Sequence, residues 1–212
     1  MDIVKFKRIF HYPCTDCFIM DFNECSCEGT DMGLGGKNHI KGCIGCKSDM
    51  SEYFHIIRDY PSLFEIVTPV LYGCEGFRSL RHVCDCLQRA NATIDNRCGL
   101  HIHIDAKTMT FDHIISIIRE YQKLEDIIDS KMSPERRNNQ CEYAKSLREL
   151  DFEGINNLDE LFAIMPDNNY KVNIKSLKKY GTLEFRHHHG SADYYEIRSW
   201  LFFVMLLCDS VK

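Results

Sequence analysis

The sequence lacks a long apolar run, a large excess of charge of either sign and low-complexity tracts. Its most apolar stretch, WLFFVMLLC at residues 200–208, is far shorter than the roughly 20 residues that a membrane-spanning helix requires. The formal net charge is only -5 and the basic residues are spread along the chain, whereas nucleic-acid-binding domains concentrate positive charge on one face. We therefore expect neither a membrane nor a nucleic acid as partner.

A secretory signal is also missing from the first residues, MDIVKFKRIFHYPC, which contain no continuous apolar stretch. Without such a signal, the twelve cysteines indicate reduced thiols or metal ligands rather than disulfides. We accordingly expect a cytoplasmic protein. With 212 residues and 44% hydrophobic content, the chain is long enough to bury one sizeable core.

Cysteine is concentrated in a first segment, residues 1–58. Two C-x-x-C pairs, CTDC and CIGC, flank a glycine-rich stretch and offer four thiolates: Cys14, Cys17, Cys43 and Cys46. Paired motifs of this form predict a structural zinc knuckle, in which each pair supplies two ligands of a tetrahedron. Cys25, Cys27 or His39 are substitutes for one ligand. The alternative is a cysteine-rich segment without metal.

The rest of the chain, residues 59–212, is predicted to form a core domain whose strands share one feature. Each strand is apolar on one face and polar on the other, because successive side chains of a strand point to opposite sides. The strands are LFEIVTP (63–69), CGLHIHIDAK (98–107), YKVNIKSL (170–177) and TLEFRHHHG (182–190). Their polar faces carry six candidate site residues: Glu65, His101, His103, Asn173, Glu184 and Arg186. A sheet face that bears a site is favoured over a merely solvated face.

Helices with readable ends separate these strands. We expect them at residues 75–91, 110–129, 133–147, 157–162 and 192–212. Thr110, Ser133 and Asn157 are predicted N-caps, and Pro134 fits the first position of its helix. The order of strands and helices is that of an α+β protein, in which helices cover the apolar side of an antiparallel sheet.

Several motifs in this order and spacing resemble the amidoligase family, part of the wider glutamine synthetase and glutamate-cysteine ligase group of carboxylate-amine ligases. The motifs are EIVTPVLYG, CGLHIHID, NNQCEYAKSL, YKVNIKSL and GTLEFRHHHGSADYYEIRSW, and the resemblance spans residues 59–212. Several motifs in the right order are far more specific than one. The resemblance implies a curved antiparallel β-sheet with a polar concave face and helices packed on the other face, the glutamine synthetase-like catalytic fold.

That resemblance implies an enzyme, an ATP-dependent carboxylate-amine ligase that forms an amide or isopeptide bond through an acyl phosphate. Its partners would be a small-molecule or peptide carboxylate and an amine, with ATP and Mg²⁺ as cofactors. The carboxylates implied to hold Mg²⁺ are Glu65, Glu184 and Asp21. The residues implied for catalysis are Arg186, His101 and His103, and those implied for binding ATP or substrate are Asn173, Arg136 and Arg137.

The histidines on the polar faces do not suit a Mg²⁺ site. Imidazole is a poor ligand for Mg²⁺, so His101 and His103 are better suited to one phosphate donor and one contact to substrate or to a softer metal. Which histidine takes which role stays open. Of the three consecutive histidines at 187–189, at most His188 shares the face of Glu184, and the run equally fits a solvated strand end.

The chain departs from the family at the first strand, which in relatives has the form F-G-v-E-i-E and supplies two glutamates. The nearest stretch here, CFIMDFNE at 17–24, places Asp21 and Asn23 at those positions, and a neutral asparagine is a weaker ligand. The alternative hypothesis is therefore a catalytically degenerate ligase fold that acts as a zinc-containing binding or interaction module. A core truncated at its C-terminus is a further reading. A metal-dependent hydrolase of the His-x-His barrel type is disfavoured, because such a barrel usually needs upward of about 250 residues.

We predict about one tightly bound zinc ion per chain, held by the two cysteine pairs. Replacing Cys14 or Cys43 by serine should release the ion, because loss of one thiolate opens the tetrahedron and unfolds that segment. Elemental analysis of protein purified without chelator measures the zinc content. A wild-type protein without zinc would favour the cysteine-rich segment that holds no metal.

Overall fold

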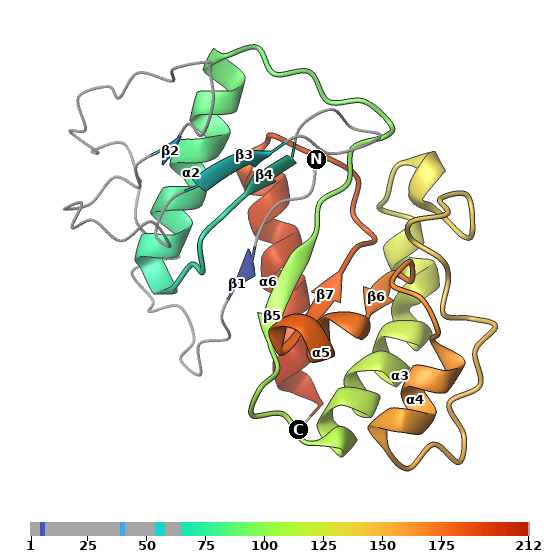
Figure 1. Cartoon of the computed structure of the whole chain (residues 1–212). Helices are drawn as coiled ribbons and strands as arrows, with labels where there is room; N and C mark the ends of the chain where they lie inside the picture. Colours follow the sequence, from blue (N-terminus) through green and yellow to red (C-terminus); the bar gives the residue numbers. More distant parts are fainter. Residues whose placement is uncertain (1–4, 7–38, 41–53, 58–64, 212) are drawn as a thin grey trace.

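The computed structural model describes residues 5–6, 39–40, 54–57 and 65–211 (Figure 1). The helices in that part of the chain are α2 Gly73–Arg89, α3 Phe111–Asp129, α4 Leu158–Ile164, α5 Lys175–Tyr180 and α6 Tyr194–Ser210. Its strands are β1 Lys5–Phe6, β2 His39–Ile40, β3 Phe54–Ile57, β4 Glu65–Val67, β5 Ile102–Asp105, β6 Val172–Asn173 and β7 Thr182–Phe185. The expected α+β class is confirmed. None of these helices combines the length and hydropathy needed to span a bilayer.

The strands form two sheets rather than the one curved antiparallel sheet that we expected. The larger sheet has the order β1-β5-β7-β6, in which β1 runs parallel to β5 and the other pairs are antiparallel. The smaller sheet is antiparallel, with the order β2-β3-β4. In the larger sheet His103 and Asn173 both lie opposite Glu184, so three predicted site residues form one row across the strands. The likeness to glutamine synthetase stays a prediction.

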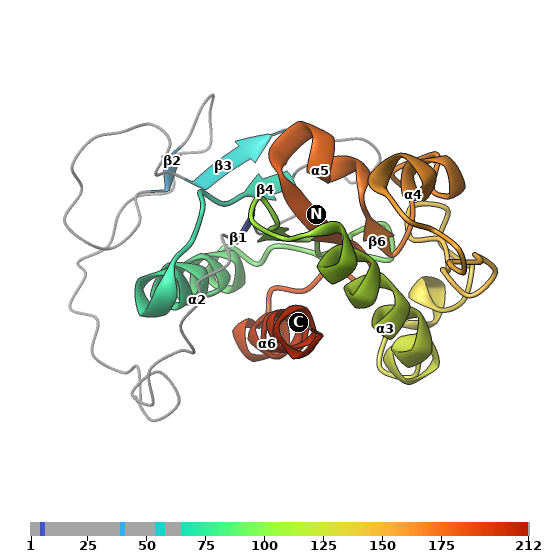
Figure 2. The same ribbon diagram turned by 90° about the horizontal axis from the view of Figure 1, so that it is seen from below.

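The core lies between the larger sheet and three helices. Figure 2 shows α2, α3 and α6 on one side of that sheet, and α5 with the smaller sheet on the other. The residues that alternate with the site residues, Ile102, Ile104, Leu183 and Phe185, are buried. The ring of Tyr121 on α3 packs against Phe185, with centroids 5.8 Å apart. The polar face of the strands is therefore turned away from α3, as alternation predicts.

Two of the predicted helix caps are confirmed. The Thr110 hydroxyl and the Asn157 side-chain oxygen each accept a hydrogen bond from the backbone N–H three residues further on, at 3.2 Å and 3.0 Å. The last helix, α6, begins at Tyr194 behind an Asp193 cap. The sequence predicts these caps correctly because a cap depends on a few neighbouring residues.

The predicted helix over residues 133–147 is wrong. Only Pro134–Arg136 is helical, as one 3-10 turn, and the expected serine cap does not form. Asn138 has φ of 50°, in the left-handed region, which interrupts any right-handed helix there. Backbone N–H groups of this segment donate instead to the carboxylates of Glu125 and Asp129 on α3.

The predicted strand over residues 170–177 is shorter than expected. β6 covers only Val172–Asn173, after which the Asn173 side-chain oxygen accepts from the Lys175 N–H at 2.8 Å. That bond turns the chain into α5, which ends at Gly181 with φ of 68°. Lys175 therefore lies on a helix and not on the sheet face.

A buried ion network joins α3 to the start of β6. Alternation places Lys171 on the polar face, but its side chain is fully buried against α3. The Lys171 ammonium donates to Glu125 Oε1 at 2.8 Å and to Asp129 Oδ1 at 2.7 Å, and Arg148 also pairs with Asp129. Two cations and two carboxylates thereby balance one another inside the protein, as buried charges require.

His187 extends this network in its neutral form. Burial, with help from the charge of Lys171, lowers the pKa of His187 to about 3. Its Nε2 donates to Asp129 Oδ1 over 2.6 Å, and its Nδ1 accepts from the Tyr121 hydroxyl over 2.7 Å. The segment that follows β7 is therefore tied to α3 by hydrogen bonds as well as by apolar packing.

The cysteines of the described residues are in two states. Those at Cys84, Cys86, Cys98, Cys141 and Cys208 are not disulfide-bonded. Cys74, in the first turn of α2, is disulfide-bonded, so the expectation that the cysteines are all reduced or metal-bound is wrong for this residue. Burial raises the pKa of Cys84 to about 12, and this thiol packs as a small apolar side chain.

We predict that Asp129→Asn lowers the free energy of unfolding by about 3 to 5 kcal/mol at neutral pH, because it leaves Lys171 and Arg148 without their full counter-charge. Burial would raise the pKa of Asp129, but hydrogen bonds from Lys171, from a backbone N–H and from Arg148 outweigh it and hold the pKa well below its usual range. The ionised form therefore stabilises the fold at neutral pH. That contribution should fade as the pH falls below about 4, where aspartate in the unfolded chain becomes protonated.

Guanidinium unfolding of both proteins at several pH values measures this difference. Asp126→Asn is the matched control, because Asp126 lies on the same helix and pairs with Arg148 at 2.9 Å, yet its side chain is 85% exposed. The control should change stability little. Equal losses in the two variants would contradict a network that depends on burial.

Candidate functional site

Glu184 on β7 is the centre of a polar cluster on the face of the larger sheet turned away from α3. Its Oε1 lies 2.7 Å from Arg186 Nη1 and 2.9 Å from His101 Nδ1. The same oxygen lies 3.6 Å from His103 Nε2, and Oε2 accepts from the Asn173 amide. The structure thus brings together five of the six residues that alternation placed on a polar face. Their parts in catalysis and binding stay predictions.

The cluster keeps Glu184 ionised. Burial would raise the pKa of this carboxyl, but the adjacent imidazoles of His101 and His103 and the charge of Arg186 outweigh burial and hold the pKa well below its usual range. His101 Nδ1 lies between an oxygen that only accepts and, at 3.2 Å, an Arg186 nitrogen that only donates. The shorter contact, to Glu184, favours a proton on Nδ1 of His101 that is donated to the carboxylate.

Arg186 follows β7 and is held at two of its three nitrogens. Nη1 donates to Glu184, and Nε donates to the Tyr143 carbonyl at 3.2 Å. Nη2 has no hydrogen-bond partner in the described part of the chain. A guanidinium that is fixed on one edge and open on the other suits an anion such as a phosphate or a carboxylate.

His103 is positioned by residues at both ends of the α5–β7 turn. Its Nδ1 lies 2.9 Å from Thr182 Oγ1, and its ring meets the Tyr180 ring edge-on, with centroids 5.9 Å apart. The 3.6 Å from Nε2 to Glu184 is too long for a hydrogen bond. His103 Nε2 is therefore turned toward the cluster without being bound tightly by it.

Sequence reasoning missed two supports of this cluster. Thr182 lies on the polar face by alternation, so a signal existed, although it was not singled out. No sequence pattern could have identified the carbonyl of Tyr143, because any residue can supply a backbone carbonyl. Only the path of the loop brings this one to Arg186.

Asn173 is committed to the protein itself. Its amide nitrogen donates to Glu184, and its oxygen accepts from the Lys175 N–H. The residue is 4% exposed, so it orients the carboxylate and starts α5. Its implied role in binding ATP or substrate stays a prediction.

Glu65 comes from a different sheet. It lies on β4, opposite Ile57 of β3, and among the described strands no pairing connects β4 with the strand that carries Glu184. Alternation predicts which face of its strand Glu65 occupies, but it does not predict to which sheet that strand belongs. A shared site with Glu184 stays a prediction.

Arg136 and Arg137 both contact the backbone. Arg136 is 3% exposed, with Nη1 3.4 Å from the Arg186 carbonyl oxygen. A Cβ atom at Gly99 would lie only 2.5 Å from Arg136 Nη2, so any larger residue there would require the guanidinium to shift. Arg137 Nε donates to the Met132 carbonyl at 2.9 Å. The implied roles of both arginines in binding ATP or substrate stay predictions.

Mg²⁺ fits the Glu184 cluster only in part. In the described part of the chain, Glu184 is the only carboxylate among the five side chains in mutual contact. Its Oε2 accepts one hydrogen bond, from Asn173, and keeps a lone pair for a metal. Because Mg²⁺ demands octahedral oxygen coordination, further oxygens would have to come from Glu65, Asp21 or phosphate groups. Asp21 lies outside the described residues, as do the predicted zinc ligands Cys14, Cys17, Cys43 and Cys46.

The histidines after β7 leave the polar face. His187 is fully buried in the network with α3, and His188, which is 4% exposed, packs against Trp200 of α6 with ring centroids 5.3 Å apart. Placing His188 on the face of Glu184, or the run in solvent, was therefore wrong. β7 ends at Phe185, and strict alternation ends with it.

A family model described as "Putative amidoligase enzyme" matches residues 47–208, more than half of the chain. The chain therefore belongs to the amidoligase family, and by that description it is a ligase in the broad sense. The matched range includes every residue of the Glu184 cluster. No curated protein and no solved structure gives a significant match.

We predict that Glu184→Gln lowers the free energy of unfolding by about 1.5 to 3 kcal/mol at neutral pH, the range for hydrogen bonds to a charged group. The pKa of Glu184 is lowered in the folded protein, so the ionised form contributes fully above the unfolded pKa. The difference between wild type and variant should therefore narrow as the pH falls below about 4.

Chemical unfolding at neutral and acidic pH measures that difference. Glu149→Gln, at an exposed glutamate between α3 and α4, is the control and should change stability by less than about 0.5 kcal/mol. If the loss caused by Glu184→Gln were the same at both pH values, a carboxylate stabilised by its neighbours would be the wrong description.

Proposed function

We propose that the protein is an ATP-dependent carboxylate-amine ligase that forms an amide or isopeptide bond through an acyl phosphate. Membership of the amidoligase family supports a ligase. The observation that carries the proposal further is Arg186, which Glu184 and Tyr143 hold on one edge while Nη2 has no partner in the described residues. Such a group suits the negative charge that develops on a transferred phosphoryl group.

Arg186 would donate from Nη2 to an oxygen of that phosphoryl group. Glu184 would not contact the phosphate but would hold Nη1, so that the guanidinium plane keeps its orientation through the reaction. The Arg186 side chain is 13% exposed, and charge interactions are stronger where water is largely excluded. Preorganised donors of this kind stabilise developing charge without reorganising at the moment of reaction.

The proposed substrates are a small-molecule or peptide carboxylate and an amine. The carboxylate attacks the γ-phosphorus of ATP and ADP leaves; the amine then attacks the acyl carbon, phosphate leaves, and one amine proton is transferred to a base. Among the histidines, His103 has the looser contact with Glu184 and is placed to donate to a phosphate oxygen, with Thr182 holding its other nitrogen. Mg²⁺ held by Glu184 with Glu65 or Asp21 would neutralise charge on the phosphate oxygens.

ATP turnover tests this proposal. The protein should convert ATP to ADP only with Mg²⁺, and faster when a suitable carboxylate and amine are both present, because the acyl phosphate waits for its nucleophile. Arg186→Ala should lower kcat by about a hundredfold or more. Arg186→Lys should restore little of it, since an ammonium lacks the planar fork.

Arg78→Ala, at a surface arginine of α2 whose side chain is 40% exposed, is the matched control and should leave turnover unchanged. Because Arg186→Ala also removes the counter-charge of Glu184, a melting curve must show that the variant is folded. Failure of Mg²⁺-dependent turnover with every substrate mixture, even after Asp21 and Asn23 are changed to glutamate, would reject the ligase.

The second candidate is a ligase fold without catalysis that serves as a zinc-containing binding module. One observation favours it: in the described residues Glu184 is the only carboxylate of its cluster, and protein donors already engage both of its oxygens. ATP binding without turnover, together with zinc held by the cysteine pairs, is the result that this candidate predicts.

A further inference from the structure

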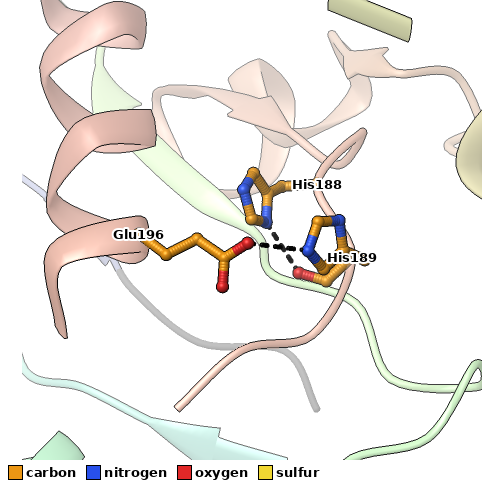
Figure 3. Close-up of side chains that lie close together, drawn as sticks. All are labelled: His188, His189 and Glu196. Atoms are coloured by element: carbon orange, nitrogen blue, oxygen red, sulfur yellow. Dashed lines mark hydrogen bonds and ion pairs between the residues drawn. The ribbon is translucent and has the colours of Figure 1, made fainter. Parts of the chain in front are cut away.

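A second cluster of polar side chains lies where the chain passes from β7 to α6 (Figure 3). One potential ligand atom from each of His188, His189 and Glu196 lies within 4.8 Å of the other two. His188 is buried, whereas the side chains of His189 and Glu196 are 24% and 39% exposed. Glu196 belongs to the first turn of α6 and the histidines precede that helix, so one short piece of chain supplies the cluster.

We propose that His188, His189 and Glu196 bind one divalent transition-metal ion, with zinc as the best fit. Two imidazoles and one carboxylate form a donor set that zinc takes in tetrahedral geometry, with a fourth position left for water or another ligand. Donor atoms in such a site lie about 3.4 Å apart, so the side chains draw together when the ion binds. None of these residues takes part in the ligase reaction proposed above.

His188 already has the tautomer that a metal ligand at Nε2 needs. Its Nδ1 donates to the His189 carbonyl at 2.7 Å, which leaves the lone pair of Nε2 for a metal. Histidines that bind metals are commonly held by such a bond from the other ring nitrogen. Trp200 packs against the His188 ring, and Glu196 is steadied by the Ser191 hydroxyl, which donates to Oε2.

His189 must change its tautomer to bind the ion. Its Nδ1 accepts from the Ser133 N–H at 3.3 Å, and its Nε2 donates to Glu196 Oε1 at 2.8 Å. When Nε2 binds the metal, its proton passes to Nδ1, so the ring stays neutral and no proton is released. Because Nδ1–H and the Ser133 N–H are both donors, the ring turns away from this N–H; the buried Ser133 hydroxyl, which has no hydrogen-bond partner within residues 65–211, is a free acceptor in this region.

The two imidazole rings are stacked, with centroids 4.4 Å apart and planes 25° from parallel. One ring must turn for both to point at the same ion. His189 is the more exposed of the pair, whereas His188 is enclosed by Trp200. His189 therefore turns toward an ion that His188 and Glu196 position.

The charges around the cluster select against Mg²⁺ and Ca²⁺. Glu196 is its one carboxylate, Arg136 acts electrostatically on His188, and Lys131 lines the adjoining pocket. An ion held mainly by charge and oxygen ligands is disfavoured beside these cations. Zinc binds imidazole nitrogen strongly and is much less dependent on net charge.

A pocket of about 360 Å³ adjoins the cluster between the end of α3 and α6. His188 and Glu196 line it together with mostly apolar side chains: Ile127, Ile128, Met132, Trp200 and Phe203. The fourth coordination position can therefore face a space that admits water or a small ligand. This open site differs from the closed thiolate site predicted near the start of the chain.

Cobalt(II) is the probe for the test, because it accepts the ligands of zinc and its spectrum distinguishes thiolate from imidazole coordination. The full chain, freed of metal with a chelator, is titrated with cobalt chloride. Cobalt bound by cysteines shows a sulfur-to-metal charge-transfer band, whereas the proposed site gives ligand-field absorption without that band. We expect both kinds of signal in wild type. Glu196→Gln and His189→Asn should each weaken the sulfur-free binding by about tenfold or more.

Glu160→Gln is the matched control, because Glu160 stands three residues after the cap of α4, as Glu196 does in α6. It should bind cobalt like the wild type. Melting curves check folding, and His189→Asn, at a partly exposed residue, decides the matter if Glu196→Gln does not fold. Cobalt absorption of sulfur character alone, or unchanged sulfur-free binding in the folded site variants, would overturn the proposal.

Discussion

The two carboxylates that α3 buries, Glu125 and Asp129, hold the Glu184 cluster in place from the opposite side of the sheet. They neutralise Lys171 just before β6, and the carbonyl of Lys171 accepts the Arg186 N–H at 2.8 Å. They also accept N–H groups of the loop after α3, and the same loop supplies the Tyr143 carbonyl that holds Arg186 Nε. The backbone and the side chain of Arg186 therefore both depend on one buried network.

A purely apolar core would not hold Arg186 in this way. Replacing buried ion pairs by well-packed apolar groups is often neutral or stabilising, so the network is weak evidence for stability alone. The loop over residues 138–147 has few helix or strand hydrogen bonds of its own, and its buried N–H groups need acceptors. Carboxylates on a rigid helix provide them at fixed positions. The network therefore specifies the path of the loop, and with it the direction of Arg186.

The sequence predicted the Glu184 cluster where the reason was local. Alternation correctly grouped His103, Asn173 and Glu184, because the side chains of a strand obey a period of two wherever the strand is paired. Alternation failed for Lys171, because this residue lies just outside β6 and its side chain points to the carboxylates of α3. It also could not say that the strand of Glu65 belongs to another sheet, since alternation gives the face of a residue and not its neighbours.

The helix predicted over residues 133–147 does not form because contacts to α3 override the local sequence signals. Its start signals were real, and one 3-10 turn forms at Pro134–Arg136. Beyond that turn, contacts to α3 outweigh local propensity, and Asn138 takes a left-handed conformation that permits them. The Leu147 N–H bonds to Glu125, which lies 22 residues earlier, and a short sequence window does not contain both partners.

The end of β7 shows how packing gives neighbouring residues different chemistry. His187 is a neutral link in the ion network, His188 packs its ring against Trp200 of α6, and His189 lies at the partly exposed edge. Arg136 lies close to both polar clusters, since it contacts the Arg186 carbonyl and acts on His188. It can reach this position because Gly99, on the paired segment, has no side chain to exclude it. The buried charge of Arg136 repels other cations, so near His188 it favours a metal ion that binds strongly to imidazole nitrogen. Near Arg186 the same charge favours an anion. The position of Arg136 is therefore consistent with phosphate chemistry at one cluster and with metal chemistry at the other.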